Sequence, residues 1–179
     1  MSQPEPAKPA KLVIGVFMRE KQLIETVGRR LVNHFGPVDL VSHWFAFDYT
    51  HYYAKEMGAG LCRRMMTFQA MIGQEELPEI KQFTNAVEAE FSDSGMRRIN
   101  IDPGYLVHER FVLATGKNFS HRIYIGNGIY ADLTLIYHKG TFQALAWTYP
   151  DYTAAEMLEF LERARNKYIF DFKQSGFTP

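Results

Sequence analysis

The sequence of 179 residues has one cysteine, no net charge and no long apolar segment. Because Cys62 has no second thiol to pair with, an intramolecular disulfide is excluded, and a reducing cytoplasm is the expected location. Twenty basic residues balance twenty acidic ones, so overall charge does not favour a nucleic-acid partner, and only a local basic patch keeps that alternative open. No stretch approaches the roughly 18 apolar residues of a membrane span, so we expect no membrane partner.

Four known catalytic motifs are incomplete in this chain. Gly116 and Lys117 lack the rest of a phosphate-binding P-loop, because Phe111 stands where a glycine is needed and Asn118 where Ser or Thr is needed. The string IYIGNGIY holds both halves of the GIY-YIG nuclease motif, but in the wrong order and within one hairpin. The H-x-[ST] triplets of two-histidine phosphoesterases and the G-x-S-x-G elbow of serine hydrolases are absent. These motifs therefore assign no reaction.

Apolar periodicity predicts the order β-α-β-β-α-β for the first hundred residues. The expected helices are 21–35 and 78–92, and the expected strands are 11–18, 38–47, 61–72 and 97–101. Met and Gln residues leave a helix open as an alternative for 61–72. A turn at Asp102-Pro103-Gly104 is expected to end the fourth strand. This order predicts an α+β fold with a ferredoxin-like core, in which an antiparallel sheet carries its helices on one face.

The rest of the chain predicts an antiparallel β-meander and a closing helix. The composition of 106–115 favours a short helix over a strand. Gly126-Asn127-Gly128 indicates a hairpin between strands 121–125 and 129–138, because Asn and Gly tolerate a positive φ. Lys139-Gly140 leads into a third strand at 141–147, and 154–168 is the closing helix. We expect a disordered lead-in at 1–10, one globular domain at 11–170 and a tail at 171–179.

Two segments concentrate side chains that are able to do chemistry: 47–58, and a second that begins at Asn100 and includes 113–122. Lysine is a point charge and arginine a bidentate fork, and together they suit a phosphate or a carboxylate. The expected catalytic residues are Asp48, Asp102 and His121. The expected ligand-binding residues are the cations and aromatic rings nearby, namely Tyr49, Tyr52, Lys117, Arg122 and Trp147.

A purely structural explanation of the same residues stays open. In it, Asp102 caps the following turn, Lys117 is a solvated helix end, and Arg122 pairs with Asp132 across the hairpin. A metal also stays open, although no known zinc spacing is matched by the candidate ligands Asp48, His51, Glu56, Asp102 and His108.

Two functions fit these residues. The first is a binding site for a small anionic ligand, phosphorylated or nucleotide-like, with hydrolysis or group transfer at phosphorus as the reaction to test first. The alternative is a non-catalytic module that binds a protein or RNA partner through aromatic loops. Convergence of the charged residues in one concave cavity would favour the first. The sequence decides neither whether the protein is an enzyme nor its cofactor or oligomeric state.

Four ordered strings carry a family resemblance: FDYTHYYAKEMG, NIDPGYL, LATGKNFSHRIYIGNGIYADLTLIY and WTYPDY. They resemble the hallmark segments of domain-of-unknown-function family 4416, with coverage from Lys11 to about Tyr168. The resemblance implies a bacterial or archaeal cytoplasmic single-domain protein. It implies no reaction, substrate or cofactor, so no catalytic residue is carried over from the family.

Overall fold

The structure is a computed structural model that describes residues 3–47, 54–93 and 95–174. Its strands are β1 (Ala10–Met18), β2 (Val38–Val41), β3 (Phe45–Ala46), β4 (Cys62–Ile72), β5 (Ser92–Asp93), β6 (Met96–Arg97), β7 (Ile99–Leu106), β8 (Arg110–Thr115), β9 (Arg122–Gly126), β10 (Ile129–His138) and β11 (Thr141–Ala144). Its helices are η1 (Lys21–Leu23), α1 (Ile24–Phe35), α2 (Ala54–Met57), η2 (Gln74–Glu76), α3 (Leu77–Glu90), η3 (Pro150–Thr153) and α4 (Ala155–Gln174).

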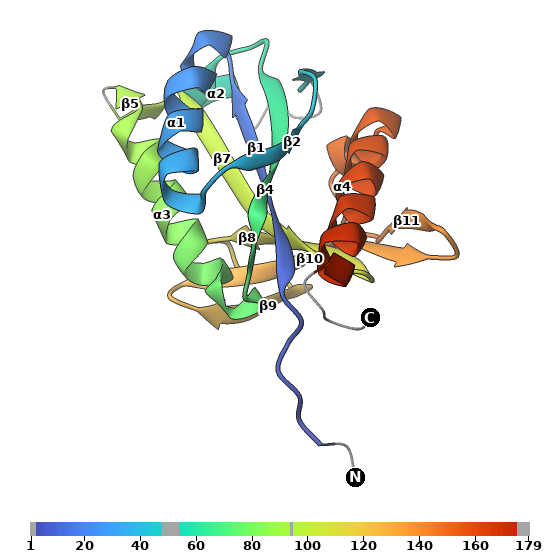
Figure 1. The fold of residues 1–179 in the computed structure, drawn as a ribbon. Coiled ribbons are helices and arrows are strands. Elements are labelled where there is room, and N and C mark those ends of the chain that lie inside the picture. The colour runs from blue at the N-terminus through green and yellow to red at the C-terminus, as the bar shows by residue number, and fades with distance from the viewer. Residues whose placement is uncertain (1–2, 48–53, 94, 175–179) are drawn as a thin grey trace.

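An antiparallel sheet with helices on both faces forms the centre of the protein (Figure 1). In the described ranges nine strands join in this sheet, along the path β11-β10-β8-β7-β1-β4-β2, with β3 on β4 and β9 on β10. The predicted α+β class is confirmed. Helices α1 and α3 share one face, as expected, but α4 covers the opposite face (Figure 1). Coverage on both sides explains why every residue of β1 is buried.

The predicted strand at 38–47 is divided into β2 and β3, both on the outer edge of β4. Ser42 causes the interruption, because its hydroxyl donates to the His43 carbonyl at 2.6 Å and accepts the Met65 N–H at 2.9 Å. These bonds replace regular strand pairing at this point. The predicted strand at 61–72 is confirmed by β4, which pairs with β1 along most of its length, and the helix alternative is wrong.

Two predictions around residues 102–115 are wrong. The Asp102-Pro103-Gly104 segment does not end the fourth strand but lies inside β7, and 106–115 forms the end of β7, a turn and strand β8 in place of a helix. The Val107 N–H donates to the Arg110 carbonyl at 3.1 Å and closes the turn. Strand β8 pairs with β7 on one edge and β10 on the other, and this pairing outweighs the local helix preference.

Strands β7 and β8 pair over a short stretch and then diverge. Gly104–Leu106 pair with 111–113, whereas β7 stays paired with β1 back to Ile99 and β8 stays paired with β10 up to Thr115. The result is an opening between 99–103 and 114–117, which we call the fork. Gly104 lies where the fork begins, and a Cβ there would lie 2.4 Å from the Val112 carbonyl oxygen. Only glycine permits this close approach.

The C-terminal meander confirms the predicted hairpins. Gly126, Asn127 and Gly128 have φ values of 111°, 54° and 75°, and the turn joins β9 to β10. Lys139 and Gly140, with φ of 51° and 88°, connect β10 to β11. The meander extends the main sheet. The closing helix α4 continues six residues past the predicted end at Tyr168, to Gln174. None of the helices in the described part has the length and apolar character that crossing a membrane requires.

A buried ammonium group joins both ends of the described chain. Lys11 on β1 is fully buried, and its Nζ donates to Asp39 Oδ2 at 2.8 Å, to Asp171 Oδ2 at 2.8 Å and to the Phe68 carbonyl at 3.1 Å. Burial by itself raises the pKa of Asp39, but the hydrogen bonds from Lys11 and Thr67 outweigh it and hold that pKa below its usual value. The lysine therefore ties β1 to β2, β4 and α4.

We expect Gly104→Ala to lower the free energy of unfolding by about 3 kcal/mol, because the new Cβ must push Val112 away. The matched control is Gly28→Ala in α1, where nothing lies within 4 Å of the added carbon. That change should stabilise the protein by about 0.5–1 kcal/mol through helix propensity. Urea unfolding of the three proteins is the measurement. Equal effects of the two substitutions would contradict the close approach at the fork.

We expect Asp39→Asn to cost about 2–4 kcal/mol at pH 7, because it removes one carboxylate from a buried ammonium. The pKa of Asp39 is lowered in the folded state, so its contribution is full above the unfolded pKa of about 4 and is lost as the pH falls below it. The difference in the free energy of unfolding between wild type and variant should therefore decrease from pH 5 to pH 2 in urea titrations. Exposed Glu159→Gln on α4 is the control, and a difference that is constant with pH would refute the assignment.

Candidate functional site

The fork opens into a cavity of about 690 Å³, which we call the fork cavity. Its size lies within the range of roughly 300–1,000 Å³ typical of small-molecule sites. Strand β7 supplies one wall, the end of β8 supplies the other, and α3 and η3 complete it. The charged side chains in the lining are Arg63, Lys81, Glu88, Arg97, Asp102, Lys117, Arg122, Asp132 and Asp151.

Asp102 is the carboxylate that a ligand in this cavity would meet first. Its side chain is 24% exposed, whereas those of Glu88, Asp132 and Asp151 are 6–8% exposed. The Asn100 amide donates to Asp102 Oδ1 at 2.9 Å and fixes its orientation. Two cations lie just beyond hydrogen-bond distance, Lys81 Nζ at 3.8 Å from Oδ1 and Arg63 Nη2 at 3.9 Å from Oδ2.

A second group of charges builds the frame of the cavity. Arg97 donates two bonds of 2.7 Å to the two oxygens of Glu56, one of 2.8 Å to Asn100 Oδ1 and one of 3.2 Å to Glu88 Oε2. The Glu56 bonds raise the pKa of Arg97, so it stays charged. Glu88 also accepts the backbone N–H of Ile101 at 2.7 Å. Burial raises the pKa of Glu88, against the nearby charge of Lys81. These bonds fasten α3 to β7.

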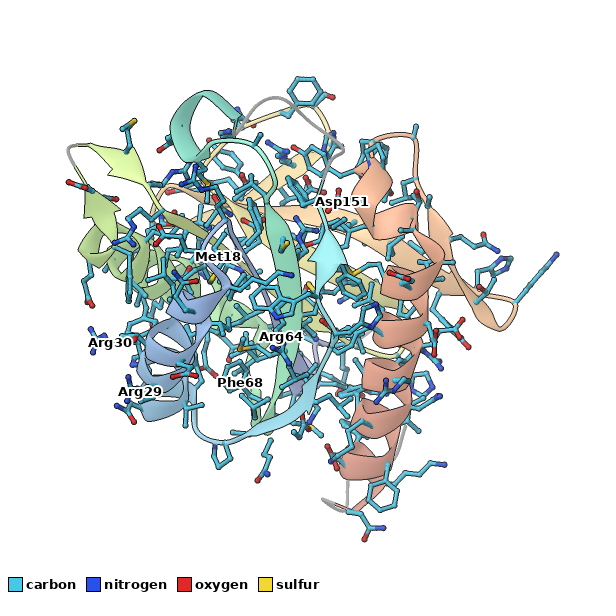
Figure 2. The ribbon with its side chains drawn as sticks, turned by 90° about the horizontal axis from the view of Figure 1, so that it is seen from above. Met18, Arg29, Arg30, Arg64, Phe68 and Asp151 are labelled. Carbon is cyan, nitrogen blue, oxygen red and sulfur yellow. The ribbon has the colours of Figure 1, made fainter. Side chains whose placement is uncertain are left out.

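Arg63 lines the fork cavity on the side of β4. Its guanidinium carbon lies 4.9 Å from the ring centre of Phe17 and 4.8 Å from those of Phe47 and Tyr152. Its Nη1 makes a close ion pair with Asp151, which lies beside the start of α4 (Figure 2). Burial raises the pKa of Asp151, against the charge of Arg63. A cation over aromatic faces is stabilised most where water is excluded, as it is here.

Arg122 is at the opposite side of the cavity. Its Nε donates to Asp132 Oδ2 at 2.9 Å, Nη1 to the Lys117 carbonyl at 3.0 Å and Nη2 to the Tyr149 hydroxyl at 2.9 Å. The pairing of Arg122 with Asp132, expected under the structural explanation, is therefore present. The same guanidinium also lines the cavity, so the two explanations are compatible for this residue.

His121 and Trp147 lie behind this wall and do not line the fork cavity. His121 Nε2 is 3.3 Å from Asp132 Oδ2, and its ring stacks on Trp147 at 4.9 Å with an interplanar angle of 8°. The Trp147 indole N–H donates to the Leu133 carbonyl at 2.8 Å. Both rings therefore support Asp132 from outside the cavity.

The structure brings together three of the expected site residues, Asp102, Lys117 and Arg122, in one concave cavity. Asp102 lies within β7 and does not cap a turn, and Lys117 follows a strand and not a helix. The remaining expected residues, Asp48, Tyr49 and Tyr52, lie outside the described residues.

Five charged lining residues were not predicted as site residues from the sequence, namely Arg63, Lys81, Glu88, Arg97 and Asp151. A signal existed for two of them. Lys81 and Glu88 fall seven residues apart on the inward face of α3, among buried apolar residues. A charge on the apolar face of a helix needs a partner inside the protein, which makes it a candidate for a site.

No group of three or more His, Cys, Asp or Glu side chains in the described ranges is arranged to hold a metal ion. Of the candidate ligands, Asp48 and His51 lie outside those ranges, and Glu56 is bound by Arg97. The described geometry therefore gives no basis for naming a metal.

We expect Arg122→Ala to lower the free energy of unfolding by about 2–4 kcal/mol, because it leaves Asp132 buried without its guanidinium. Adding Asp132→Asn should restore part of the loss by removing the uncompensated charge. The control is Arg30→Ala, whose partner Glu90 is 47% exposed, so that its loss should change the free energy of unfolding far less. Urea unfolding distinguishes these cases. An unchanged free energy of unfolding in Arg122→Ala would show that the Arg122–Asp132 pair does not stabilise this side of the fork cavity.

Comparison with protein families gives one match, to the model described as Domain of unknown function (DUF4416), over residues 8–168. No curated protein and no solved structure matches the chain. The family suggested by the hallmark strings is thus confirmed, and because the match spans far more than half of the sequence, the chain belongs to the DUF4416 family.

Proposed function

We propose that the fork cavity binds a small anionic ligand that carries a phosphate or carboxylate group. One observation supports this most directly: five basic and four acidic side chains line one cavity of about 690 Å³. The basic side chains outnumber the acidic ones by one, and burial raises the pKa values of two of the four acids, Glu88 and Asp151. A cavity with excess positive charge and restricted water attracts anions.

The anionic group would lie at Lys117 and Arg122. Among the described residues Arg122 uses three of its five N–H groups, which leaves two for a ligand oxygen. Lys117 is on the exposed segment after β8, at the cavity rim, where its ammonium reaches an incoming anion. Phe47, Leu113 and Tyr152 supply apolar wall for the remainder of the ligand.

If the protein catalyses a reaction, hydrolysis or group transfer at phosphorus fits this arrangement best. Such reactions need cations around the phosphate oxygens and a base for the attacking hydroxyl or water. Asp102 is the residue suited to be that base, because it is the most exposed of the lining carboxylates and Asn100 orients it. His121 is less suited, because it lies behind Asp132.

The ferredoxin-like core is part of the same proposal. Strands β7, β1, β4 and β2 are neighbours in this order, all pairs are antiparallel, and α1 and α3 connect them across one face. This order and these connections support a split βαβ arrangement. Strand β8 would then be an addition to the core, and the fork would lie at the boundary.

The alternative, a module that binds a protein or RNA partner through aromatic loops, has weaker support. Phe119, Ile123 and Tyr124 are 64%, 68% and 59% exposed on and before the edge strand β9. Exposed apolar side chains on an edge strand are typical of interaction surfaces. They do not point to a particular partner, whereas the volume and the charged lining of the fork cavity support a small anionic ligand.

We expect inorganic phosphate, adenosine monophosphate or succinate to raise the melting temperature of the protein, with Kd obtained by titration. Lys117→Ala should weaken the binding of the active compound roughly ten-fold, about 1.4 kcal/mol, while the fold is retained because Lys117 is exposed. Lys173→Ala on the exposed end of α4 is the charge-matched control and should bind normally. Absence of binding by all three compounds, or equal binding by the two variants, would refute the proposal.

A further inference from the structure

A smaller cavity of about 110 Å³ lies next to the fork cavity, and we call it the minor cavity. It is enclosed by β3 and Phe47 on one side and by the first residues of α4 on the other. In Figure 2 this region is marked by Asp151, beside strand β3 and the start of α4. The proposed function makes no use of this cavity.

The walls of the minor cavity are mainly apolar. Phe45, Phe47 and Met157 line it and are 7%, 6% and 2% exposed, and Ala154 completes the apolar surface. The one lining carboxylate outside the Arg63–Asp151 pair belongs to Glu156, whose side chain is 66% exposed and lies 3.2 Å from His43 Nε2. That carboxylate is therefore at the mouth, in contact with solvent. Apolar cavities of this kind favour hydrocarbon over water.

Three residues line both cavities: Phe47, Arg63 and Asp151. A group in the minor cavity and a group in the fork cavity would thus contact the same ion pair and the same ring. On the fork side the neighbours are charged, among them Lys81 and Asp102, whereas on the other side they are apolar. A molecule that spans both cavities must be charged at one end and apolar at the other.

We propose that the minor cavity is a subsite for the short alkyl chain of a ligand whose anionic group lies in the fork cavity. The inference rests on the proposed function and narrows the ligand to amphiphilic anions, such as monoalkyl phosphates. A volume of about 110 Å³ has room for a chain of roughly four to six non-hydrogen atoms, judged by the space that a bound water takes up.

The test is calorimetric titration of the full chain with inorganic phosphate and with methyl, ethyl, butyl, hexyl and octyl phosphate. Each buried methylene should tighten binding roughly three- to four-fold. The gain in affinity should stop at a defined chain length, when the alkyl chain has crossed the fork cavity and filled the minor cavity. If inorganic phosphate binds but the alkyl phosphates bind no more tightly, this inference is refuted and the proposed function survives. If none of the compounds binds, both are refuted.

Two variants test whether the alkyl chain of the ligand lies in the minor cavity. Ala154→Phe fills the minor cavity and should end the gain at a shorter chain, while leaving the affinity for inorganic phosphate unchanged. Phe45→Ala enlarges the cavity and should end the gain at a longer chain, so either variant suffices if the other fails to fold. Ala86→Phe, on the exposed side of α3, adds the same ring elsewhere and should behave as wild type. The same chain-length limit in all four proteins would overturn the assignment of this subsite.

Discussion

A guanidinium buried among three aromatic rings is stable only while a carboxylate stays beside it, and Asp151 is that carboxylate for Arg63. This ion pair joins β4, next to the outer edge of the sheet, to η3, just before the closing helix. Both of its residues line the two cavities. The pair therefore helps to position the segment that leads from β11 into α4. Loss of either partner would disturb the sheet, the helix and both cavities together.

Protonation acts in opposite directions in two parts of the protein. Burial raises the pKa values of Glu88 and Asp151, so the folded state holds their protons more tightly than the unfolded state does. Their contribution to stability is full below the unfolded pKa and is lost as the pH rises through the folded pKa. Asp39 and Asp171 have lowered pKa values and contribute only above their unfolded pKa. Burial thus disfavours the ionised forms of these two lining carboxyls, whereas the hydrogen bonds from Lys11 favour the ionised forms of Asp39 and Asp171. Carboxyl groups with perturbed pKa values are common at binding sites.

Local patterns in the sequence predicted the elements whose structure is decided locally. The apolar run of β1, the helix stop at Gly36 and the Gly126-Asn127-Gly128 hairpin depend on nearest neighbours, and all three are present. The interpretation of 102–115 was wrong, because pairing with β7 and β10 decides that conformation. The presence of Lys117 and Arg122 in the cavity lining could be predicted, because residues next to turns are open to ligands. Arg63 and Asp151, 88 residues apart, could not, since no local pattern shows that two distant charges are buried against each other.

The contact between Lys11 and Asp171 spans 160 positions of the chain. A ribosome makes the chain from its N-terminus, so β1 and its lysine emerge long before the aspartate that helps to neutralise it. Until α4 is complete, the second face of the sheet stays uncovered and one partner of a buried cation is missing. Contacts of such sequence separation have a high loop-closure entropy and slow folding. The sheet is covered on both faces, and Lys11 gains its second carboxylate, only once α4 docks.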